Sequence, residues 1–184
     1  MRLLGAIIAG GRATRFGADK GAALLHGQPL IDHIADGLRR QTDALVICGR
    51  RWPGLETISD RPSPNLGPLG GLCGALLHAA ARDFDAVLTA GCDVLPIPDS
   101  LAERLGQGPS CVAGQRLLGL WPVRLADMLE RHLRSSGDRS IRSWISLCEA
   151  QEIRLDTPLH NINAAADLEI LARQTGADNN HHCK

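Results

Sequence analysis

Residues 3–20 read LLGAIIAGGRATRFGADK. The apolar run at residues 3–9 ends in Gly10-Gly11, which predicts a buried strand that leads into a loop. The stretch contains neither the G-x-x-x-x-G-K-[ST] pattern of a P-loop nor the G-x-G-x-x-G pattern of a dinucleotide-binding fold. It therefore predicts a glycine-rich turn of another kind.

The composition of this turn favours phosphate binding. Gly10, Gly11 and Gly17 lack side chains, so backbone N–H groups can come close to phosphate oxygens. Arg15 can donate a forked pair of hydrogen bonds to phosphate, and Lys20 adds a point charge. An ordinary turn between a strand and a helix needs fewer glycines and cations, so we interpret the segment as a phosphate loop.

The rest of the first half alternates strands with helices. Buried strands are predicted at residues 44–48, 55–58 and 86–90, and helices after Pro29 and at residues 69–81. This order predicts an α/β fold of three layers, with a mostly parallel central sheet covered on both faces. Because ligands bind beyond the carboxyl ends of such strands, Gly10-Gly11, Asp60 and Asp93 should lie on one rim.

The second half has weaker patterns. Strands are predicted at residues 110–113, 117–123 and 153–155, and helices at residues 100–105, 124–133, 141–147 and 164–173, the last with Asn163 as its N-cap. We expect one domain over residues 1–175, with halves at about 1–105 and 106–175, and a polar, mobile tail at residues 176–184.

Two carboxylates follow predicted strands directly. Asp60 and Asp93 would face the basic loop, and such a pair suits Mg²⁺ held between protein and substrate phosphates. Asp93 could instead cap a helix or form a turn, and Asp60 could form a plain turn.

Two further segments allow more than one interpretation. Gly67-Pro68-Leu69-Gly70-Gly71-Leu72 could bring a helix N-terminus to a nucleotide, or could serve close packing of helix on sheet. Asn161-Ile162-Asn163 could present two amides to a heteroaromatic edge, or could form a turn and a helix cap.

Basic and histidine-rich clusters near the C-terminus are weaker candidates. Arg139 and Arg142 would share a helical face and could meet an anionic second substrate, although a solvated face is the commoner explanation. His181-His182-Cys183 resembles a metal-binding tract, but a disordered tail explains it more simply.

Composition excludes several classes of protein. The net charge is zero, while residues 1–61 hold nine Lys and Arg against six Asp and Glu, which suits an anionic small ligand better than a nucleic acid. Three Trp, two Phe and no Tyr leave few platforms for base stacking. No apolar run spans a membrane and no signal peptide is apparent, so we expect a cytoplasmic protein.

The six cysteines do not form a C-x-x-C pair, so neither a zinc ribbon nor a redox motif is indicated. Cys48, Cys73, Cys92 and Cys111 lie in apolar or glycine-rich contexts and are expected to be small buried hydrophobic residues in a reducing compartment.

Residues 8–20, IAGGRATRFGADK, resemble the L-A-G-G-x-x-x-R-M-G-x-D-K motif of molybdenum cofactor guanylyltransferases. The resemblance continues through Gly67–Leu72, Cys92-Asp93-Val94-Leu95-Pro96 and Asn161-Ile162-Asn163, in order along nearly the whole chain. Phe16 replaces the usual Met, and Cys48 stands where some members have Asn.

The resemblance implies a Rossmann-like nucleotidyltransferase fold and an enzyme that joins GMP from GTP-Mg²⁺ to molybdopterin carrying molybdenum. It implies that the nucleotide site is lined by Ile8, Ala9, Gly10 and Gly11, and that Arg15 and Lys20 hold phosphates. Asp60 would contact the nucleotide, and Asp93 would bind both the nucleotide and Mg²⁺. Asn161 and Asn163 would lie on the pterin side. Arg15, Lys20 and Asp93 would be the catalytic residues. Transient contact with cofactor-delivery or molybdoenzyme-maturation proteins is also expected.

Two alternatives remain open from the sequence. One is a cytidylyltransferase acting on the same pterin, or another small nucleotidyltransferase. The other is a non-catalytic protein that binds GTP or carries the pterin, which the two carboxylates argue against because a pure binder needs fewer metal ligands.

Overall fold

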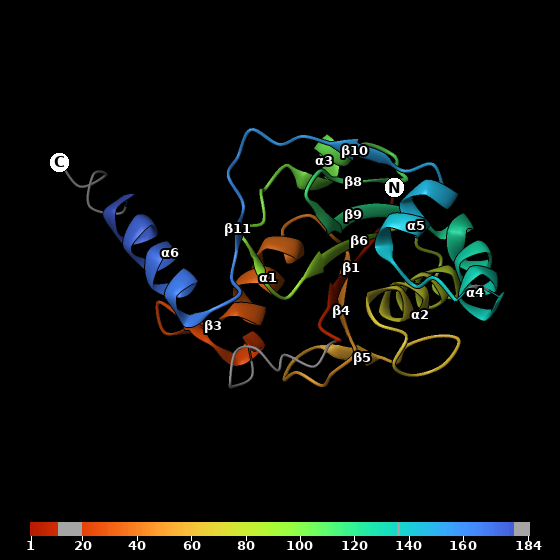
Figure 1. Ribbon diagram of the computed structural model, residues 1–184, viewed down its shortest axis with the longest axis horizontal. Coiled ribbons are helices and arrows are strands. Elements are labelled where there is room, and N and C mark those ends of the chain that lie inside the picture. Colours follow the sequence, from red (N-terminus) through yellow and green to blue (C-terminus); the bar gives the residue numbers. More distant parts are fainter. Residues whose placement is uncertain (11–19, 136, 179–184) are drawn as a thin grey trace.

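The structure is a computed structural model that describes residues 1–10, 20–135 and 137–178 (Figure 1). Within these residues seven strands form the central sheet, in the order β10-β8-β9-β6-β1-β4-β5. Their bounds are β1 Leu3–Ile8, β4 Ala44–Cys48, β5 Glu56–Ile58, β6 Ala86–Gly91, β8 Ser110–Val112, β9 Gln115–Pro122 and β10 Gln151–Ile153.

The sheet is mostly parallel, as the alternation of strands and helices predicts. β1 pairs in parallel with β4 on one side and with β6 on the other, β4 pairs in parallel with β5, and β10 with β8. Only β9 runs against both of its neighbours, β6 and β8, among the strands that the structure describes. The α/β fold class with three layers is therefore confirmed.

Helices cover both faces of the sheet (Figure 1). The described helices are α1 Leu30–Arg39, α2 Pro68–Ala80, α3 Leu101–Leu105, α4 Ala126–Ser135, α5 Ile141–Leu147 and α6 Ala165–Asp178, with 3₁₀ turns η1 Lys20–Ala22 and η2 Val123–Leu125. None of them is long and apolar enough to cross a membrane.

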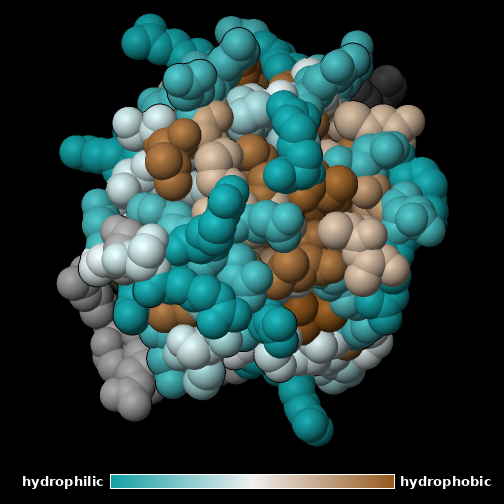
Figure 2. Space-filling view, turned by 90° about the vertical axis from the view of Figure 1, so that its right-hand side faces the viewer, coloured by the Kyte–Doolittle hydropathy of each residue, from teal (hydrophilic) through white to brown (hydrophobic). Residues whose placement is uncertain are grey.

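Alternate side chains of β1 divide between two apolar cores, because successive residues of a strand point to opposite faces. Leu4, Ala6 and Ile8 join the cluster under α2, α4 and α5, whereas Leu3 and Ile7 join the cluster under α1 and α3. Figure 2 shows the side of the molecule that carries α4 and α5, where apolar side chains reach the surface between polar ones. The strand is buried along its whole length because both faces are covered.

A buried hydroxyl joins the antiparallel strand β9 to β6. Thr89 Oγ1 donates to the carbonyl of Leu117 at 2.7 Å and accepts from Trp121 Nε1 at 2.8 Å. Both side chains are almost fully buried, so these bonds satisfy the polar atoms that burial would otherwise leave without partners. They also hold β9 against β6 on both sides of the Thr89–Gly119 pair.

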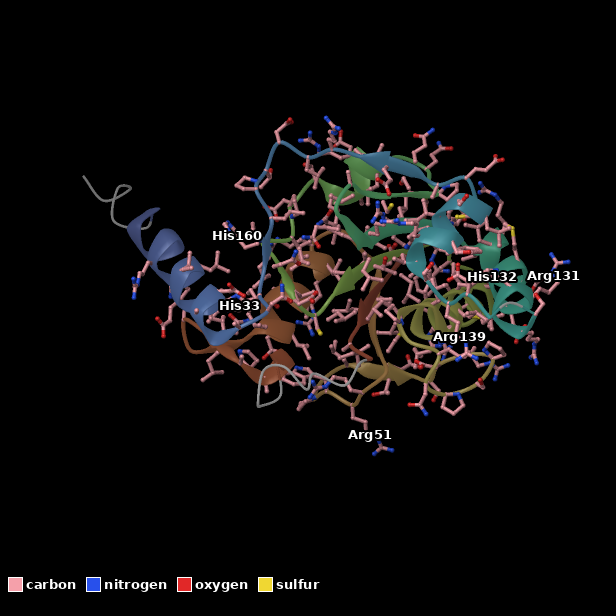
Figure 3. All side chains as sticks on the ribbon, in the orientation of Figure 1. His33, Arg51, Arg131, His132, Arg139 and His160 are labelled. Carbon is pink, nitrogen blue, oxygen red and sulfur yellow. The ribbon has the colours of Figure 1, made fainter. Side chains whose placement is uncertain are left out.

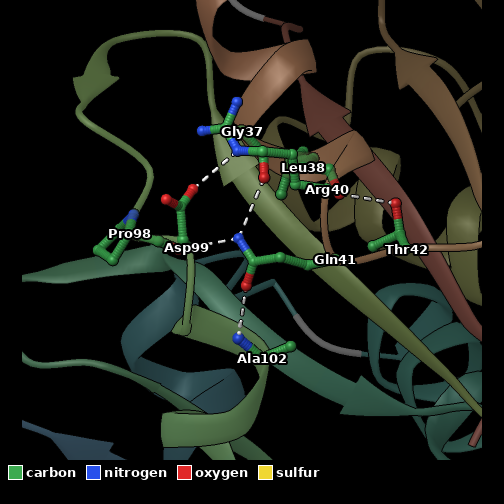
Figure 4. A network of polar contacts seen from close by, with 8 residues as sticks. All are labelled: Gly37, Leu38, Arg40, Gln41, Thr42, Pro98, Asp99 and Ala102. Carbon is green, nitrogen blue, oxygen red and sulfur yellow. Dashed lines mark hydrogen bonds and ion pairs between the residues drawn. The ribbon is translucent and has the colours of Figure 1, made fainter.

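Gln41 clamps the end of α1 to the segment before α3 (Figure 4). Its Nε2 donates to the carbonyls of Gly37 at 3.0 Å and Pro98 at 2.8 Å, and its Oε1 accepts the Ala102 N–H at 2.9 Å. One side chain thus connects elements far apart in the sequence.

Gln41→Ala is expected to lower the free energy of unfolding by about 2 kcal/mol, because partly buried backbone groups lose their partners. Urea unfolding measures this. The control is Arg40→Ala, which removes only an exposed ion pair with Asp99 and should cost less than ~1 kcal/mol. Equal effects of the two variants would contradict the clamp.

Several short elements differ from those expected from the sequence. Two antiparallel pairs, β2 Leu24–Leu25 with β3 Gln28–Pro29 and β7 Val94–Leu95 with β11 His160–Asn161, were not predicted. Strands of two residues leave no periodic pattern to detect. β10 begins and ends two residues earlier than the strand predicted at residues 153–155. Helix α6 continues to Asp178, into the segment predicted as a tail.

Candidate active site

The carboxyl ends of four parallel strands meet at one rim of the sheet. Ile8 at the end of β1 pairs with Cys48 of β4 and with Gly91 of β6, and Cys48 pairs with Ile58 of β5. The residues that follow these strands are Gly10, Gly49, Asp60 and Asp93. The predicted common rim for Gly10, Asp60 and Asp93 is therefore confirmed, whereas Gly11 and Arg15 lie outside the described residues.

The first residues of the glycine-rich loop rest directly on the backbone after β4. The Ala9 N–H donates to the Cys48 carbonyl at 3.0 Å. A Cβ on Gly49 would lie 2.4 Å from Gly10 Cα and 2.6 Å from Gly10 N, and Gly49 has φ +85°. Only glycine fits there, so Gly49 sets the position at which the loop leaves the sheet.

Gly49→Ala should destabilise the fold more than Gly54→Ala does. Gly54 also has a positive φ, +74°, but a Cβ there would meet nothing within 4 Å. The Gly54 variant should cost ~1–2 kcal/mol from backbone strain alone, and the Gly49 variant a further ~1–3 kcal/mol from overpacking. Unfolding curves of the two variants measure the difference in free energy of unfolding. Equal losses would show that the backbone at Gly10 shifts freely to make room for the new Cβ.

Asp60 is half-buried in the loop between β5 and α2. Burial raises the pKa of its carboxyl group, while the N–H groups of Leu66 and Asn65 donate to the carboxylate and partly oppose this rise. The Arg61 N–H donates to the Gly70 carbonyl at 3.0 Å, and a Cβ on Gly70 would lie 3.2 Å from Asp60 Cβ. The Gly-rich start of α2 thus packs against Asp60, so the packing interpretation of that motif holds.

A pocket of about 300 Å³ lies beside Asp60 at the ends of β4 and β5. Gly49, Arg50 and Arg51 line one side, and Ser59, Asp60 and Asn65 line the other. Arg51 projects outward below β5 in Figure 3. Sequence reasoning missed this basic pair, although two arginines directly after a buried strand were a visible signal.

Asp93 follows β6, and a hydrogen bond to its backbone carbonyl fixes its position. A Cβ on Gly91 would lie 2.9 Å from Asp93 Oδ1, so the carboxylate lies close against the end of β6. The Asp93 carbonyl accepts the Ile162 N–H at 2.8 Å. Next to it, Asn161 of β11 pairs with Val94 of β7. The structure thus brings the predicted Asn161-Ile162-Asn163 segment to Asp93.

Asp60 and Asp93 follow strands that are not neighbours in the sheet. β1 and β4 lie between β6 and β5, so the two carboxylates follow strands roughly 14 Å apart. Across the described ranges, no group of three or more His, Cys, Asp or Glu could hold a metal ion by itself. A cation at Asp93 would therefore share its coordination with substrate phosphates, which is how Mg²⁺ is commonly held.

Two other expectations need correction. Helix α6 begins at Ala165, one residue later than predicted, so Asn163 is not its N-cap; the Asp167 carboxylate accepts the N–H groups of Asn163 and Ala164 at 2.7 and 2.8 Å. Arg139 lies before Ser140, the N-cap of α5, so Arg139 and Arg142 do not share a helical face. In Figure 3, Arg139 lies on the α4–α5 side and His160 on the β11 side.

The cysteines are mostly structural, as predicted. Cys48, Cys73 and Cys111 are fully buried and free, and burial raises the pKa of the Cys48 thiol to about 12, with a smaller contribution from the negative charge of Asp60. Cys92 is the exception, because it is only half-buried beside Asp93. The Cys48 thiol, with its high pKa, stays protonated and unreactive at neutral pH.

A mostly parallel sheet with Gly10, Asp60 and Asp93 on its carboxyl rim is of the kind that binds nucleotides at that rim. Residues 5–153 match the model of the MobA-like NTP transferase domain. The chain belongs to this family.

Relatives and solved structures agree with this assignment. Proteins named molybdenum cofactor guanylyltransferase are 35% identical over 183 residues in Cereibacter sphaeroides, covering 91% of this chain and 94% of the relative, and 30% identical over 177 residues in Acidiphilium cryptum, covering 89% and 90%. Molybdopterin-guanine dinucleotide biosynthesis protein A from Archaeoglobus fulgidus superposes with a TM-score of 0.71 at 20% identity, covering 95% and 99% of the two chains. That structural likeness supports the fold.

Proposed function

We propose that the protein is a molybdenum cofactor guanylyltransferase. It transfers GMP from GTP to the terminal phosphate of molybdenum-bound molybdopterin, which gives the guanine dinucleotide cofactor and pyrophosphate. The observation that carries this proposal is the rim at which Gly10, Asp60 and Asp93 follow parallel strands, in a chain whose guanylyltransferase relatives match it over nearly its full length.

The chemistry is an in-line displacement at the α-phosphorus of GTP. A terminal phosphate oxygen of molybdopterin forms the new P–O bond, the bond between the α-phosphorus and the bridging oxygen breaks, and pyrophosphate leaves with that electron pair. A phosphate monoester is largely ionised at neutral pH, so no general base is needed. Catalysis then consists of alignment and charge neutralisation.

Each predicted residue has one role in this reaction by our proposal. Backbone groups of Ile8, Ala9, Gly10 and Gly11 would line the nucleotide site, and Arg15 and Lys20 would stabilise the charge that develops on pyrophosphate. Asp60, beside its pocket, would contact the nucleotide. Asp93 would hold a divalent cation, Mg²⁺ by our proposal, which when bound supplies positive charge next to the phosphates.

The second substrate would lie on the other side of Asp93. Asn161 and Asn163 would contact the pterin, because β11 brings them to Asp93. In this arrangement residues 1–105 bind the nucleotide and residues 106–175 complete the pterin side within one domain. The reaction would take place in the cytoplasm, and the product would pass to a cofactor-delivery or molybdoenzyme-maturation protein by transient contact.

A pyrophosphate-release assay tests the proposal. With molybdopterin and Mg²⁺ present, GTP should support release at least ~100-fold faster than CTP, since a base site built from backbone donors and acceptors rejects the wrong edge. Faster release with CTP would make the protein a cytidylyltransferase. A melting temperature raised by GTP-Mg²⁺ without any pyrophosphate would make it a binding or carrier protein.

A further inference from the structure

A second pocket of about 340 Å³ lies on the same rim, at the other end of the sheet. One wall is the turn between β8 and β9, residues 112–115, and the other is the connection from β10 to β11, which supplies residues 154–155 and 157–159. In Figure 1 this connection arcs over the top left of the molecule before it descends to β11. The volume is within the usual range of small-molecule sites.

The chain itself leads from this pocket to Asp93. Leu159 lines the pocket, and the next residue, His160, pairs with Leu95 just beyond Asp93. On the other wall, the end of β6 lies beside Leu117 of β9, because a Cβ on Gly91 would lie 3.9 Å from Leu117 Cβ. β9 runs antiparallel to β6, so Gln115, two residues before Leu117, lies further toward the rim than the end of β6. The pocket and the Asp93 carboxylate are therefore neighbours on one surface.

The Ala113 N–H donates to the Ile153 carbonyl at 2.9 Å, and this bond ties the two walls together. An ion pair between Arg104 and Asp156, at 2.7 Å, anchors the connection from outside. The same hydrogen bond from Arg104 lowers the pKa of the Asp156 carboxyl group. These two contacts connect the β8–β9 turn, the β10–β11 connection and α3.

The pocket combines an apolar floor with unused polar groups. Leu155 and Leu159 pack on the core, whereas Arg154 is exposed. The nearby carboxylate of Glu152 is already paired with Arg116 at 2.6 Å, and that of Asp156 with Arg104. Arg154 has no hydrogen-bond or ion-pair partner among residues 1–10, 20–135 and 137–178, which leaves its charge and its donors for a ligand.

We propose that this pocket binds the pterin ring of the second substrate, with Arg154 and Gln115 on the polar edge of the ring. This proposal rests on the proposed function. β8 lies two strands from β6, roughly 10 Å away, which suits a fused ring whose phosphate reaches Asp93. The nucleotide lies beyond β6 on the opposite side, over β1, β4 and β5, so both substrates fit at once.

Steady-state kinetics of Arg154→Gln test the pocket. The KM for molybdopterin should rise at least ~10-fold through loss of a charge-assisted hydrogen bond, while kcat and the KM for GTP stay within about twofold. The matched control is Arg124→Gln, an exposed arginine of η2, which follows β9 at the opposite edge of the sheet. An unchanged KM for molybdopterin, or an equal rise in the control, would overturn the proposal.

A second variant blocks the pocket without removing charge. Thr157 is exposed at the margin of the pocket, so Thr157→Trp should fold normally. It should weaken binding of neopterin monophosphate at least ~10-fold, as measured by fluorescence anisotropy. The control, Thr157→Ser, should bind neopterin monophosphate as the wild type does. The melting-temperature rise with GTP-Mg²⁺ should be the same in both variants. Equal pterin binding by all forms, or none by the wild type, would refute the pocket, whereas failure of the wild type to release pyrophosphate would refute the proposed function.

Discussion

Replacing Asp93 with alanine is expected to lower kcat by at least ~100-fold, by analogy with the loss of one charge-stabilising group at a transition state. Asp93 is the carboxylate that lies between the nucleotide strands and the proposed pterin pocket, and it is fixed by its backbone bond to Ile162. Its loss removes the side chain proposed to hold a cation against the phosphates. Steady-state pyrophosphate release with saturating GTP and molybdopterin measures the effect.

Asp99→Ala is the control for Asp93→Ala. Asp99 is exposed and pairs with Arg40 beside the Gln41 clamp at the end of α1, and this pair lies outside the rim. The control should keep turnover within about twofold. If Asp93→Ala also stayed within twofold of the wild type, Asp93 would have no part in catalysis.

Lys20→Ala is expected to lower kcat/KM for GTP at least ~100-fold, because Lys20 is proposed to neutralise charge on the departing pyrophosphate. Lys20 opens the 3₁₀ turn η1, directly after the loop residues 11–19. Lys20→Arg keeps the charge but replaces a compact ammonium by a planar fork, so it should recover only part of the activity.

Arg39→Ala is the control for the loss of a cation. Arg39 is exposed and paired with Asp36 one turn away on α1, so its removal should change kcat/KM by less than about twofold. A Lys20 variant as active as this control would show that the loop binds phosphate without Lys20.

Long apolar segments were predictable, because their burial leaves a continuous pattern. β1, β4 and β6, and the helices α1 and α2, lie within a residue or two of their expected bounds. The pairs β2–β3 and β7–β11 were not predictable, because two residues carry no period. The second pair matters most, since it moves Asn161 from a distant part of the sequence to Asp93.

Side-chain partners were also beyond the sequence. Asp167, not Asn163, satisfies the N–H groups before α6, because the helix starts one residue later than its apolar spacing suggests. The hydrogen-bond partners of Gln41 were equally unpredictable, because Pro98 and Ala102 belong to a segment that no local sequence pattern connects to α1.

The glycine-rich stretch at residues 3–20, together with the alternation after it, determined the α/β class and the common rim. These follow from local physics: apolar runs form strands, glycine opens the backbone, and parallel strands end at the same edge. Tertiary structure alone decided the order of the strands. Because β1 and β4 pair between β6 and β5, Asp60 and Asp93 stand apart, and strand order depends on long-range packing, which no short window of sequence contains.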